Sequence, residues 1–305
     1  MIIVPGSINA DLLFKVARLP RPGETVLCPS YAFAPGGKGA NQAAAAAKAG
    51  AEVRFVGHVG DDAYGPVVRG LLEAAGVDCA GLAVSGKPTA IAVIGVDAGG
   101  ENSIIVASGA NLDTAAAQVA DAVLGPGVTV LCQNEIRSAE TFAVLRRARA
   151  RGARAVLNFA PASGEVPVEV LDDLDVLIVN ELEGAALAGG GGGGDPLALA
   201  RELARRHGLA CVLTLGAKGA VAATPAEAFR AAALKVEPVD TTGAGDAFAG
   251  VLAAWLDRGA TRPAALAAAS VAAALTCERV GAQTAQPTRA MIEARLPTLP
   301  RVERV

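Results

Sequence analysis

The sequence lacks the residues on which several common kinds of site depend. Its 305 residues include only two histidines, His58 and His207, which leaves little room for a Ser-His-Asp triad or a histidine-based metal site. The five cysteines are odd in number, and no two lie close enough in sequence to form a metal-binding pair. We therefore expect reduced and mostly buried thiols, as in a cytoplasmic protein.

Charge and long apolar runs are also scarce. Charged residues make up 19% of the chain, the net charge is −3, and the basic residues are scattered, so no basic face for nucleic acid is predicted. No stretch of about 18 strongly apolar residues occurs. The first apolar run is broken at Pro5-Gly6 and has no basic leader before it. These absences predict a soluble cytoplasmic protein with neither a nucleic-acid nor a membrane partner.

Two glycine-rich nucleotide motifs are missing as well. The pattern GxxxxGK[ST] does not occur, which excludes a P-loop enzyme. After the first apolar run the chain reads GSINAD (6–11) instead of GxGxxG, so a dinucleotide-binding oxidoreductase loses its main support. Six glycines in a row at 189–194 are followed by neither Lys nor Ser/Thr, and we interpret them as a surface linker.

What the sequence does contain is an alternation of short β-branched runs with Ala/Leu-rich amphipathic segments. Buried strands are expected at 2–4, 53–57, 128–132, 153–158, 175–180 and 210–216. Helical segments are expected at 39–49, 64–75, 113–123, 138–151 and 196–206. This alternation, in a chain that is 52% hydrophobic, predicts an α/β fold with a doubly wound, mostly parallel sheet flanked by helices.

Two regions, approximately 12–35 and 82–107, break the alternation. They contain strand-like runs with no helix between neighbours, and we expect them to form a small antiparallel β lid inserted in a single domain spanning 1–305. Polar residues such as Asn9, Glu135 and Asn180 follow several expected strands. The carboxyl ends of parallel strands meet along one edge of a sheet, so a ligand site is expected there.

The stretch VDTTGAGDAFAG (239–250) sets an acid directly behind a glycine-rich turn. Glycines before a helix let backbone N–H groups point into one concavity, where the helix dipole favours negative charge. Asp246, in the first turn, would face that concavity and could accept a hydroxyl proton, which is what phosphoryl transfer requires. The alternative is an ordinary helix start that favours an acidic residue.

A second glycine cluster, AFAPGGKGANQAAAAA (32–47), begins another predicted helix. Its glycines allow a close approach of the backbone, while Lys38 and Asn41 offer donors that suit the hydroxyls of a sugar, as do Asn9 and Asp11. Viewed alone, the cluster could also be a glycine-rich loop capped by Asn41.

With these motifs in place, the chain resembles the ribokinase-like branch of the phosphofructokinase-B type sugar kinases, nearly from end to end. The matching motifs keep the family's order: GSINAD (6–11), PGET (22–25), GGKGANQA (36–43), GDD (60–62), GENSI (100–104), GAN (109–111), NELE (180–183), TLGAKG (214–219), DTTGAGDAF (240–248) and GAQ (281–283). The resemblance implies a doubly wound body, a small β lid and a homodimer formed through that lid.

The resemblance also implies an activity and the residues that carry it. The reaction would be ATP-dependent phosphorylation of the primary hydroxyl of a sugar, the 5-position if the sugar is D-ribose. Asp246 would be the base, and the backbone N–H groups of Gly243, Ala244 and Gly245 would form the anion hole. The residues implied to bind the sugar are Asn9, Asp11, Gly37, Lys38, Asn41, Glu135 and Asp246. Those implied to bind ATP are Asn180, Thr214, Gly216, Gly219, Gly245 and Ser270.

Two metal ions are implied in the same way. Asn180 and Glu183 fit an N-x-x-E pattern that acts on Mg²⁺, with Glu183 working through water. The positions that match a K⁺ site are Asp240, Thr242, Thr276, Arg279, Gly281 and Ala285. Two departures stand out: Ala285 replaces a frequent Ser at the cation, and Ser270 replaces a larger residue that commonly contacts adenine.

Several alternatives stay open at this point. Lys38 in GGKGAN distinguishes the chain from fructokinase-like relatives, and nothing near Asn9 or Glu135 clearly supplies the basic pocket that a phosphosugar kinase needs. A kinase of another sugar or of a nucleoside remains possible. So does a non-catalytic sugar-binding regulator on the same fold, since fold alone does not imply activity.

Overall fold

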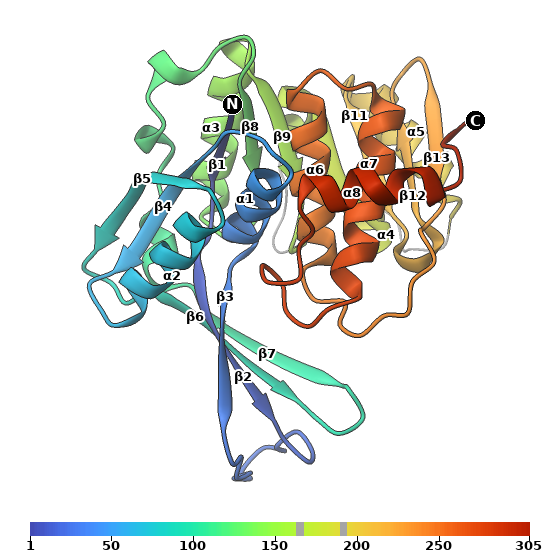
Figure 1. Cartoon of the computed structure of the whole chain (residues 1–305). Coiled ribbons are helices and arrows are strands. Elements are labelled where there is room, and N and C mark those ends of the chain that lie inside the picture. Colours follow the sequence, from blue (N-terminus) through green and yellow to red (C-terminus); the bar gives the residue numbers. More distant parts are fainter. Residues whose placement is uncertain (163–167, 190–193) are drawn as a thin grey trace.

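A ten-stranded sheet forms the body of the molecule (Figure 1). The computed structural model describes residues 1–162, 168–189 and 194–305; most of the glycine run, 190–193, therefore lies outside the described residues, and its interpretation as a linker stays a prediction. The strand order is β14-β13-β12-β11-β10-β9-β8-β1-β4-β5. The strands are β1 (Ile2–Pro5), β4 (Val53–Gly60), β5 (Asp78–Ser85), β8 (Thr129–Cys132), β9 (Arg154–Asn158), β10 (Val176–Asn180), β11 (Ala210–Thr214), β12 (Ala220–Ala223), β13 (Ala228–Ala231) and β14 (Glu303–Arg304).

The pairing confirms the predicted mostly parallel sheet. Every neighbouring pair from β5 through β11 is parallel, and only β12, β13 and β14 continue the sheet in antiparallel fashion. Strands β1 and β8 are buried along their whole length. That burial is why they read as continuous apolar runs instead of alternating patterns.

Helices cover both faces of this sheet (Figure 1). One hydrophobic core lies beneath α1 (Lys38–Lys48), α2 (Tyr64–Ala74), α6 (Ala244–Asp257), α7 (Arg262–Cys277) and α8 (Arg289–Arg295). The other lies beneath α3 (Ser138–Ala150), α4 (Glu181–Leu187) and α5 (Pro196–His207). The shorter 3₁₀ turns are η1 (Gly109–Asp113), η2 (Ala116–Gln118), η3 (Asp121–Val123), η4 (Val168–Asp173), η5 (Gly216–Lys218) and η6 (Leu296–Thr298).

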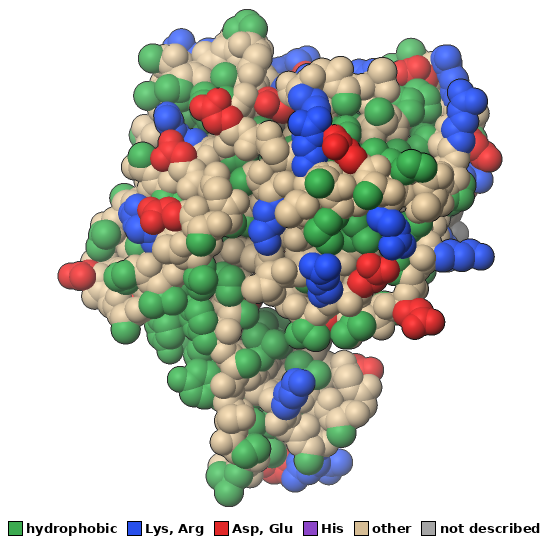
Figure 2. Space-filling view, in the orientation of Figure 1, with side chains coloured by type: hydrophobic (Ala, Val, Ile, Leu, Met, Phe, Trp, Pro, Cys, Tyr) green, Lys and Arg blue, Asp and Glu red, His purple; other side chains and the backbone are tan. Residues whose placement is uncertain are grey.

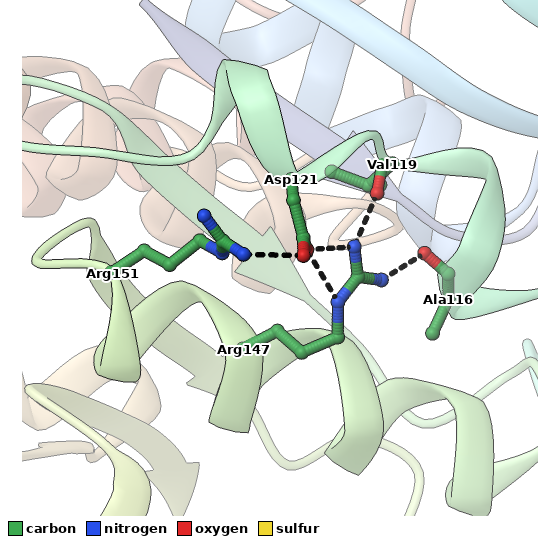
Figure 3. Close-up of polar contacts among 5 residues, drawn as sticks. All are labelled: Ala116, Val119, Asp121, Arg147 and Arg151. Carbon is green, nitrogen blue, oxygen red and sulfur yellow. Dashed lines mark hydrogen bonds and ion pairs between the residues drawn. The ribbon is translucent and has the colours of Figure 1, made fainter.

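The prediction of a helix over 113–123 was wrong. This stretch contains the end of η1 followed by η2 and η3, with extended residues between them. The Arg147 guanidinium on α3 donates to the backbone carbonyls of Ala116 and Val119 and pairs with Asp121, which Arg151 also contacts (Figure 3). The backbone of this stretch is thus held in short 3₁₀ turns that contact a side chain of α3.

The predicted lid is confirmed as a separate four-stranded sheet in the order β3-β2-β6-β7 (Figure 1). Its strands are β2 (Asn9–Lys15), β3 (Tyr31–Gly36), β6 (Ala90–Val96) and β7 (Asn102–Ala107). The outer pairs are antiparallel as expected, but the central β2–β6 pair is parallel. The reason is topological: β2 follows β1 and β6 follows β5, so both strands leave the same end of the body (Figure 1).

The boundaries of the lid also differ from the expectation. Residues 24–29 are not a strand, whereas 82–85 belong to β5 of the main sheet. The lid is joined to the body by an aromatic contact, since Phe33 of β3 stacks on Tyr64 at the start of α2 with ring centroids 6.1 Å apart.

The lid exposes much of its apolar surface. Every residue of β7 is exposed. Figure 2 shows hydrophobic side chains on the surface of the lid. The large exposed hydrophobic side chains of its strands are Tyr31, Phe33, Ile104, Ile105 and Val106. Among the described residues, no helix combines the length and the apolar character needed to cross a membrane. All five cysteines are free, and three of them are buried.

Candidate active site

Asp246 lies in the first turn of α6, where the sequence predicts it. The helix begins after Gly243, whose φ of 75° is left-handed, and a side chain at that position would come within 2.8 Å of Ala282. Glycine is therefore required there both by conformation and by space. Asp246 is only 7% exposed, so its carboxylate sits at the positive end of a helix with little access to bulk water.

Helix α1 packs against α6 closely enough to reach this carboxylate. A Cβ on Gly250 would lie 2.4 Å from the carbonyl oxygen of Gln42 and 2.8 Å from the methyl group of Ala45. Asp246 precedes Gly250 by four residues and so shares its helix face. The small residue at 250 thus brings the polar start of α1 beside Asp246.

Both oxygens of Asp246 accept hydrogen bonds from side-chain amides of α1. Asn41 Nδ2 donates to Oδ2 and Gln42 Nε2 donates to Oδ1, each at 2.9 Å. Asn41 is fixed in turn by Gln283 Nε2, which donates to its Oδ1 at 3.0 Å. The orientation of the Asp246 carboxylate is therefore fixed by one amide donor on each oxygen.

The start of α1 is fastened to the turn between β1 and β2. Glu135 Oε2 accepts from the Ser7 hydroxyl at 2.7 Å and from the Lys38 backbone N–H at 2.9 Å. A side chain at Gly37, whose φ is 87°, would meet the Ile8 Cα at 2.8 Å. The glycines around Lys38 are therefore dictated by this close approach, whatever ligand the site binds.

Lys38 is the cation among the acidic groups of the site. Asp246 raises the pKa of Lys38, burial lowers it, and Glu135 and Glu183 raise it further, with a net upward shift. Asp246, Glu135 and Glu183, from three separate segments, therefore all lie near Lys38.

The lid contributes Asp11, from β2, to the same group of charges. Burial raises the pKa of Asp11 to about 7, with the charges of Glu135 and Asp246 adding to the effect. Its Oδ1 is buried and has no hydrogen-bond partner. A Cβ on Gly36 of the neighbouring strand would lie 2.1 Å from this carboxyl group. Asp11 is thus a crowded carboxyl group with an unused acceptor.

Asn9, at the start of β2, is held by a residue that had no predicted role. Asn111 Nδ2 donates to Asn9 Oδ1 at 2.8 Å, and Asn111 Oδ1 accepts the Ile8 backbone N–H at 3.1 Å. The amide nitrogen of Asn9 is consequently turned away from Asn111.

Asn180 and Glu183 form a reciprocal cap on α4. The Asn180 side chain accepts from the Glu183 N–H, and the Glu183 carboxylate accepts from the Asn180 N–H, each at 2.8 Å. Burial raises the pKa of Glu183, against the lowering effects of the Asn180 N–H and of Lys38. One oxygen of Glu183 is therefore occupied in helix capping.

The predicted nucleotide residues of the 214–219 motif follow β11. Thr214 ends that strand, and its hydroxyl lies 3.4 Å from the Val179 carbonyl. Gly216 has a φ of 55° with open space around it, whereas a Cβ on Gly219 would lie 2.1 Å from the Ala231 carbonyl. Gly219 is thus required where the turn between β11 and β12 packs against the end of β13, and Gly216 borders free space.

Ser270 is buried in the middle of α7, and its hydroxyl donates to the Leu266 carbonyl one turn earlier. At the predicted anion hole, the Ala244 N–H makes a 3.3 Å turn bond to the Thr241 carbonyl, while a Cβ on Gly245 would meet nothing within 4 Å. The space in front of Gly245 is therefore open to a ligand.

The segments with the predicted K⁺ positions are joined by Asp240. Its carboxylate accepts from the backbone N–H groups of Thr242 and Gly281, both at 2.9 Å. Burial raises the pKa of Asp240, but these hydrogen bonds outweigh it and the net shift is downward. Thr276 is buried with its hydroxyl on the Ala272 carbonyl.

The remaining two K⁺ positions lie in the same loop. Arg279 is exposed, and its N–H bonds to the Thr276 carbonyl, while Ala285 is buried. An ionised carboxylate beside the carbonyl oxygens of a loop is a donor set suited to a hard cation. Across the described ranges, no cluster of three or more His, Cys, Asp or Glu residues could bind a metal ion directly.

Sequence reasoning missed the amides that surround Asp246. Gln42 directly follows the predicted ligand Asn41, and Asn158 ends β9, so a polar residue at a strand end was an available signal. Gln283 belongs to the matched GAQ motif but had no predicted role. None of these contacts is visible in the sequence, because each joins residues more than 100 positions apart.

Three comparisons place the chain among known proteins. The profile of the pfkB family carbohydrate kinases matches residues 1–289. Ribokinase from Bacillus subtilis is 37% identical over 96% of this chain and 98% of its own length. Ribokinase from Thermotoga maritima superimposes with a TM-score of 0.88 at 33% identity, covering 97% of this chain and 99% of its own. Ribokinase from Arabidopsis thaliana, solved with ribose and ATP, gives a TM-score of 0.87 at 30% identity, covering 97% and 98%.

Proposed function

The chain belongs to the pfkB family of carbohydrate kinases, and from that premise we propose that it transfers the γ-phosphoryl group of ATP to the 5-hydroxyl of D-ribose, forming ribose 5-phosphate. The observation that carries the proposal is Asp246, a buried carboxylate at a helix start whose two oxygens accept from Asn41 and Gln42. Its similarity to the Arabidopsis ribokinase solved with ribose and ATP supports both substrates.

Asp246 acts as the general base in this proposal. Its carboxylate accepts the proton of the sugar's primary hydroxyl as the oxygen attacks the γ-phosphorus, and ADP leaves on the opposite side. The backbone N–H groups of Gly243, Ala244 and Gly245 stabilise the charge on the migrating group. The open space in front of Gly245 supports this placement. For Ala244, binding a phosphoryl group would require release of its turn bond to Thr241.

The sugar is held between the body and the lid. Lys38 and Asn41 on α1 donate to its hydroxyls, and Asp11 on β2 accepts from them. The unpaired Oδ1 of Asp11 supports this role, because a sugar hydroxyl would satisfy it. The other residues proposed to hold the sugar are Asn9, Gly37 and Glu135.

ATP lies along the start of α6 and the ends of β10 and β11. The residues proposed to bind it are Asn180, Thr214, Gly216, Gly219, Gly245 and Ser270. Glu183 is proposed to hold Mg²⁺ through water, because one of its carboxylate oxygens is already used by the α4 cap. A bound Mg²⁺ would neutralise charge on the ATP phosphates.

A K⁺ ion fits the loop that Asp240 holds together, through carbonyl oxygens from the segments around Thr242 and Thr276–Ala285. Ala285 offers only its backbone carbonyl there. When bound, the cation would supply positive charge beside the anion hole. The residues Asp240, Thr242, Thr276, Arg279, Gly281 and Ala285 are proposed to form this site.

We propose a cytoplasmic homodimer formed through the lid. The exposed Tyr31, Ile104, Ile105 and Val106 would be covered by the partner's lid, and the edge strands β3 and β7 would be protected from other pairing. Ile105→Lys should shift the protein toward the monomer in sedimentation velocity, and an unchanged dimer would rule out this interface.

The activity is tested by ADP formation from ATP with and without D-ribose, followed by ³¹P and ¹³C NMR of the product. A panel of pentoses, hexoses and nucleosides, compared by kcat/KM, should place D-ribose first and the new phosphate on its 5-oxygen. A higher kcat/KM for another sugar or a nucleoside would establish the alternative kinase. Ribose binding without ADP formation would indicate a non-catalytic sugar-binding regulator.

A further inference from the structure

Three buried side-chain amides form a chain behind Asp246. Gln133 Nε2 donates to Gln42 Oε1 at 2.8 Å, and Gln42 Nε2 donates both to Asp246 Oδ1 at 2.9 Å and to Asn158 Oδ1 at 2.8 Å. Gln42 has an exposed fraction of 0%, and Gln133 and Asn158 are also buried. The chain therefore connects the ends of β8 and β9 to α1 and α6 without contact with bulk water.

A backbone carbonyl of the sheet sets the direction of this chain. Asn158 Nδ2 donates to the Ile178 carbonyl at 3.2 Å, and that carbonyl also accepts the Phe159 N–H at 2.9 Å. A carbonyl oxygen can only accept, so the Asn158 amide must turn its own oxygen toward Gln42. Gln42 must then present its NH₂ group to Asn158 and its oxygen to Gln133.

The consequence reaches Asp246. Because the Gln42 amide is fixed in this sense, its second N–H can point only at Asp246 Oδ1. An ionised carboxylate accepts and does not donate, so the N–H of Gln42 is the kind of partner that this form of Asp246 needs. A hydrogen bond to a charged group in a dry site is stronger than one between neutral groups.

We propose that Gln42 is a positioning residue for the base: it fixes the orientation of the Asp246 carboxylate and favours its ionised form, while remaining out of reach of the sugar. The inference rests on the proposed role of Asp246. In this proposal Lys38 supplies the positive charge beside Asp246, and Gln42 fixes the orientation of the carboxylate.

The test uses Gln42→Met, which keeps the length of the side chain and removes the donor, and Gln42→Glu, which keeps the shape and replaces the donor with an acid. For Gln42→Met, kcat should fall on the order of ten- to a hundredfold, while the ribose KM changes little. The acidic limb of the pH–kcat profile should move to higher pH by about one unit, because an ionised carboxylate without its donor is less stable. Gln42→Glu should move it further, through repulsion between two acids.

A matched control is Gln118→Met. Gln118 is partly buried, and its side chain donates to the backbone carbonyl of Gly57. It lies in η2 and makes no contact with Asp246. It should leave kcat and the pH profile at the parent values. A general loss of packing in Gln42→Met would lower the melting temperature without moving the acidic limb, and that result would overturn the proposal.

Gln133→Met gives a second test in case the Gln42 variants do not fold. It removes the donor that fixes Gln42 Oε1 and should move the acidic limb in the same direction by a smaller amount. Suppose that Asp246→Asn abolishes turnover, but that the acidic limb stays at the parent pH in both Gln42→Met and Gln133→Met. The positioning role of Gln42 would then be refuted, whereas the role of Asp246 as the base would not. If Asp246→Asn itself turns over normally, the proposed function fails first.

Discussion

The body and the lid each bring one aspartate to the candidate site, and the two differ in how completely their oxygens are hydrogen-bonded. On the body, Asp246 has an amide donor on each oxygen, and those donors are fixed by further amides. On the lid, Asp11 has a buried oxygen without a partner, and burial together with Glu135 and Asp246 raises its pKa to about 7.

The difference separates two tasks. In the proposed mechanism the body carries the part of the site that must not move during proton transfer, and its contacts are complete before a ligand binds. The lid would carry the part that recognises the ligand, and the unsatisfied carboxyl group of Asp11 would gain a partner when a sugar hydroxyl donates to it. The ten-stranded sheet is covered on both faces, whereas β7 of the lid is exposed along its whole length.

Removing the body's aspartate should have the largest effect. Asp246→Asn keeps the size of the side chain but abolishes the proton acceptor, so kcat should fall about 10²–10⁴-fold. Ribose affinity, measured by calorimetry, should remain close to that of the parent. Asp78→Asn, at an exposed ion pair with Arg54, serves as the control and should keep full activity. Turnover near the parent rate in Asp246→Asn would eliminate the proposed base.

Loosening the junction between body and lid should come next. Glu135 fastens both Ser7 and the start of α1, so Glu135→Ala should raise the ribose KM roughly ten- to a hundredfold, the range expected for a hydrogen bond to a charged group. The ATP KM should change far less. Glu135→Gln retains an acceptor and should show a smaller increase. If only the ATP KM rose, Glu135 would belong to the other substrate.

Exchanging the monovalent cation should change the turnover rate several-fold, through a site that lies in the body and not in the lid. Turnover should be faster in KCl than in tetramethylammonium chloride at equal ionic strength, and Asp240→Asn should reduce that difference because it weakens the link between the two segments of the loop. Thermal stability of the parent in the two salts provides a readout independent of activity. Equal rates and equal melting temperatures in both salts would refute the cation site.

The lid's aspartate should also affect the stability of the ligand-free protein. The folded-state pKa of Asp11 is raised from its ordinary value of 3.8 to about 7, so between these pH values the folded protein binds more protons than the unfolded chain. The contribution of Asp11 to the free energy of unfolding is therefore present at low pH and is lost as the pH rises toward 7.

Asp11→Asn removes this contribution, and the free energy of unfolding in urea should then fall less steeply with pH than in the parent. Between pH 5 and pH 7.5 the free energy of unfolding of the parent should fall by about 2–3 kcal/mol more than that of Asp11→Asn. Parallel pH dependences would show that Asp11 titrates normally.

Much of this arrangement was predictable from sequence because local rules determine it. The buried β-branched runs identified the parallel strands, and Gly243 followed by Asp246 identified a helix start, since both features depend on neighbouring residues. The prediction of a helix over 113–123 was wrong because local pattern does not show contacts with distant residues. Here the carbonyls of Ala116 and Val119 accept hydrogen bonds from Arg147.

The amides around Asp246 could not be predicted for a related reason. Gln42 looks like one more polar residue at the start of a helix, and its partners Asn158 and Asp246 lie 116 and 204 positions away. Likewise, the parallel β2–β6 pairing follows from the direction in which two distant strands leave the body, which no local pattern encodes.

A crystal structure with D-ribose and a non-hydrolysable ATP analogue would test the central claim most directly, through one distance. The account predicts the 5-oxygen of ribose within roughly 2.6–3.2 Å of an Asp246 carboxylate oxygen, with the γ-phosphorus in line beyond it and Asn41 and Gln42 still bonded to the carboxylate. A 5-oxygen directed away from Asp246, or a different side chain in that position, would contradict it.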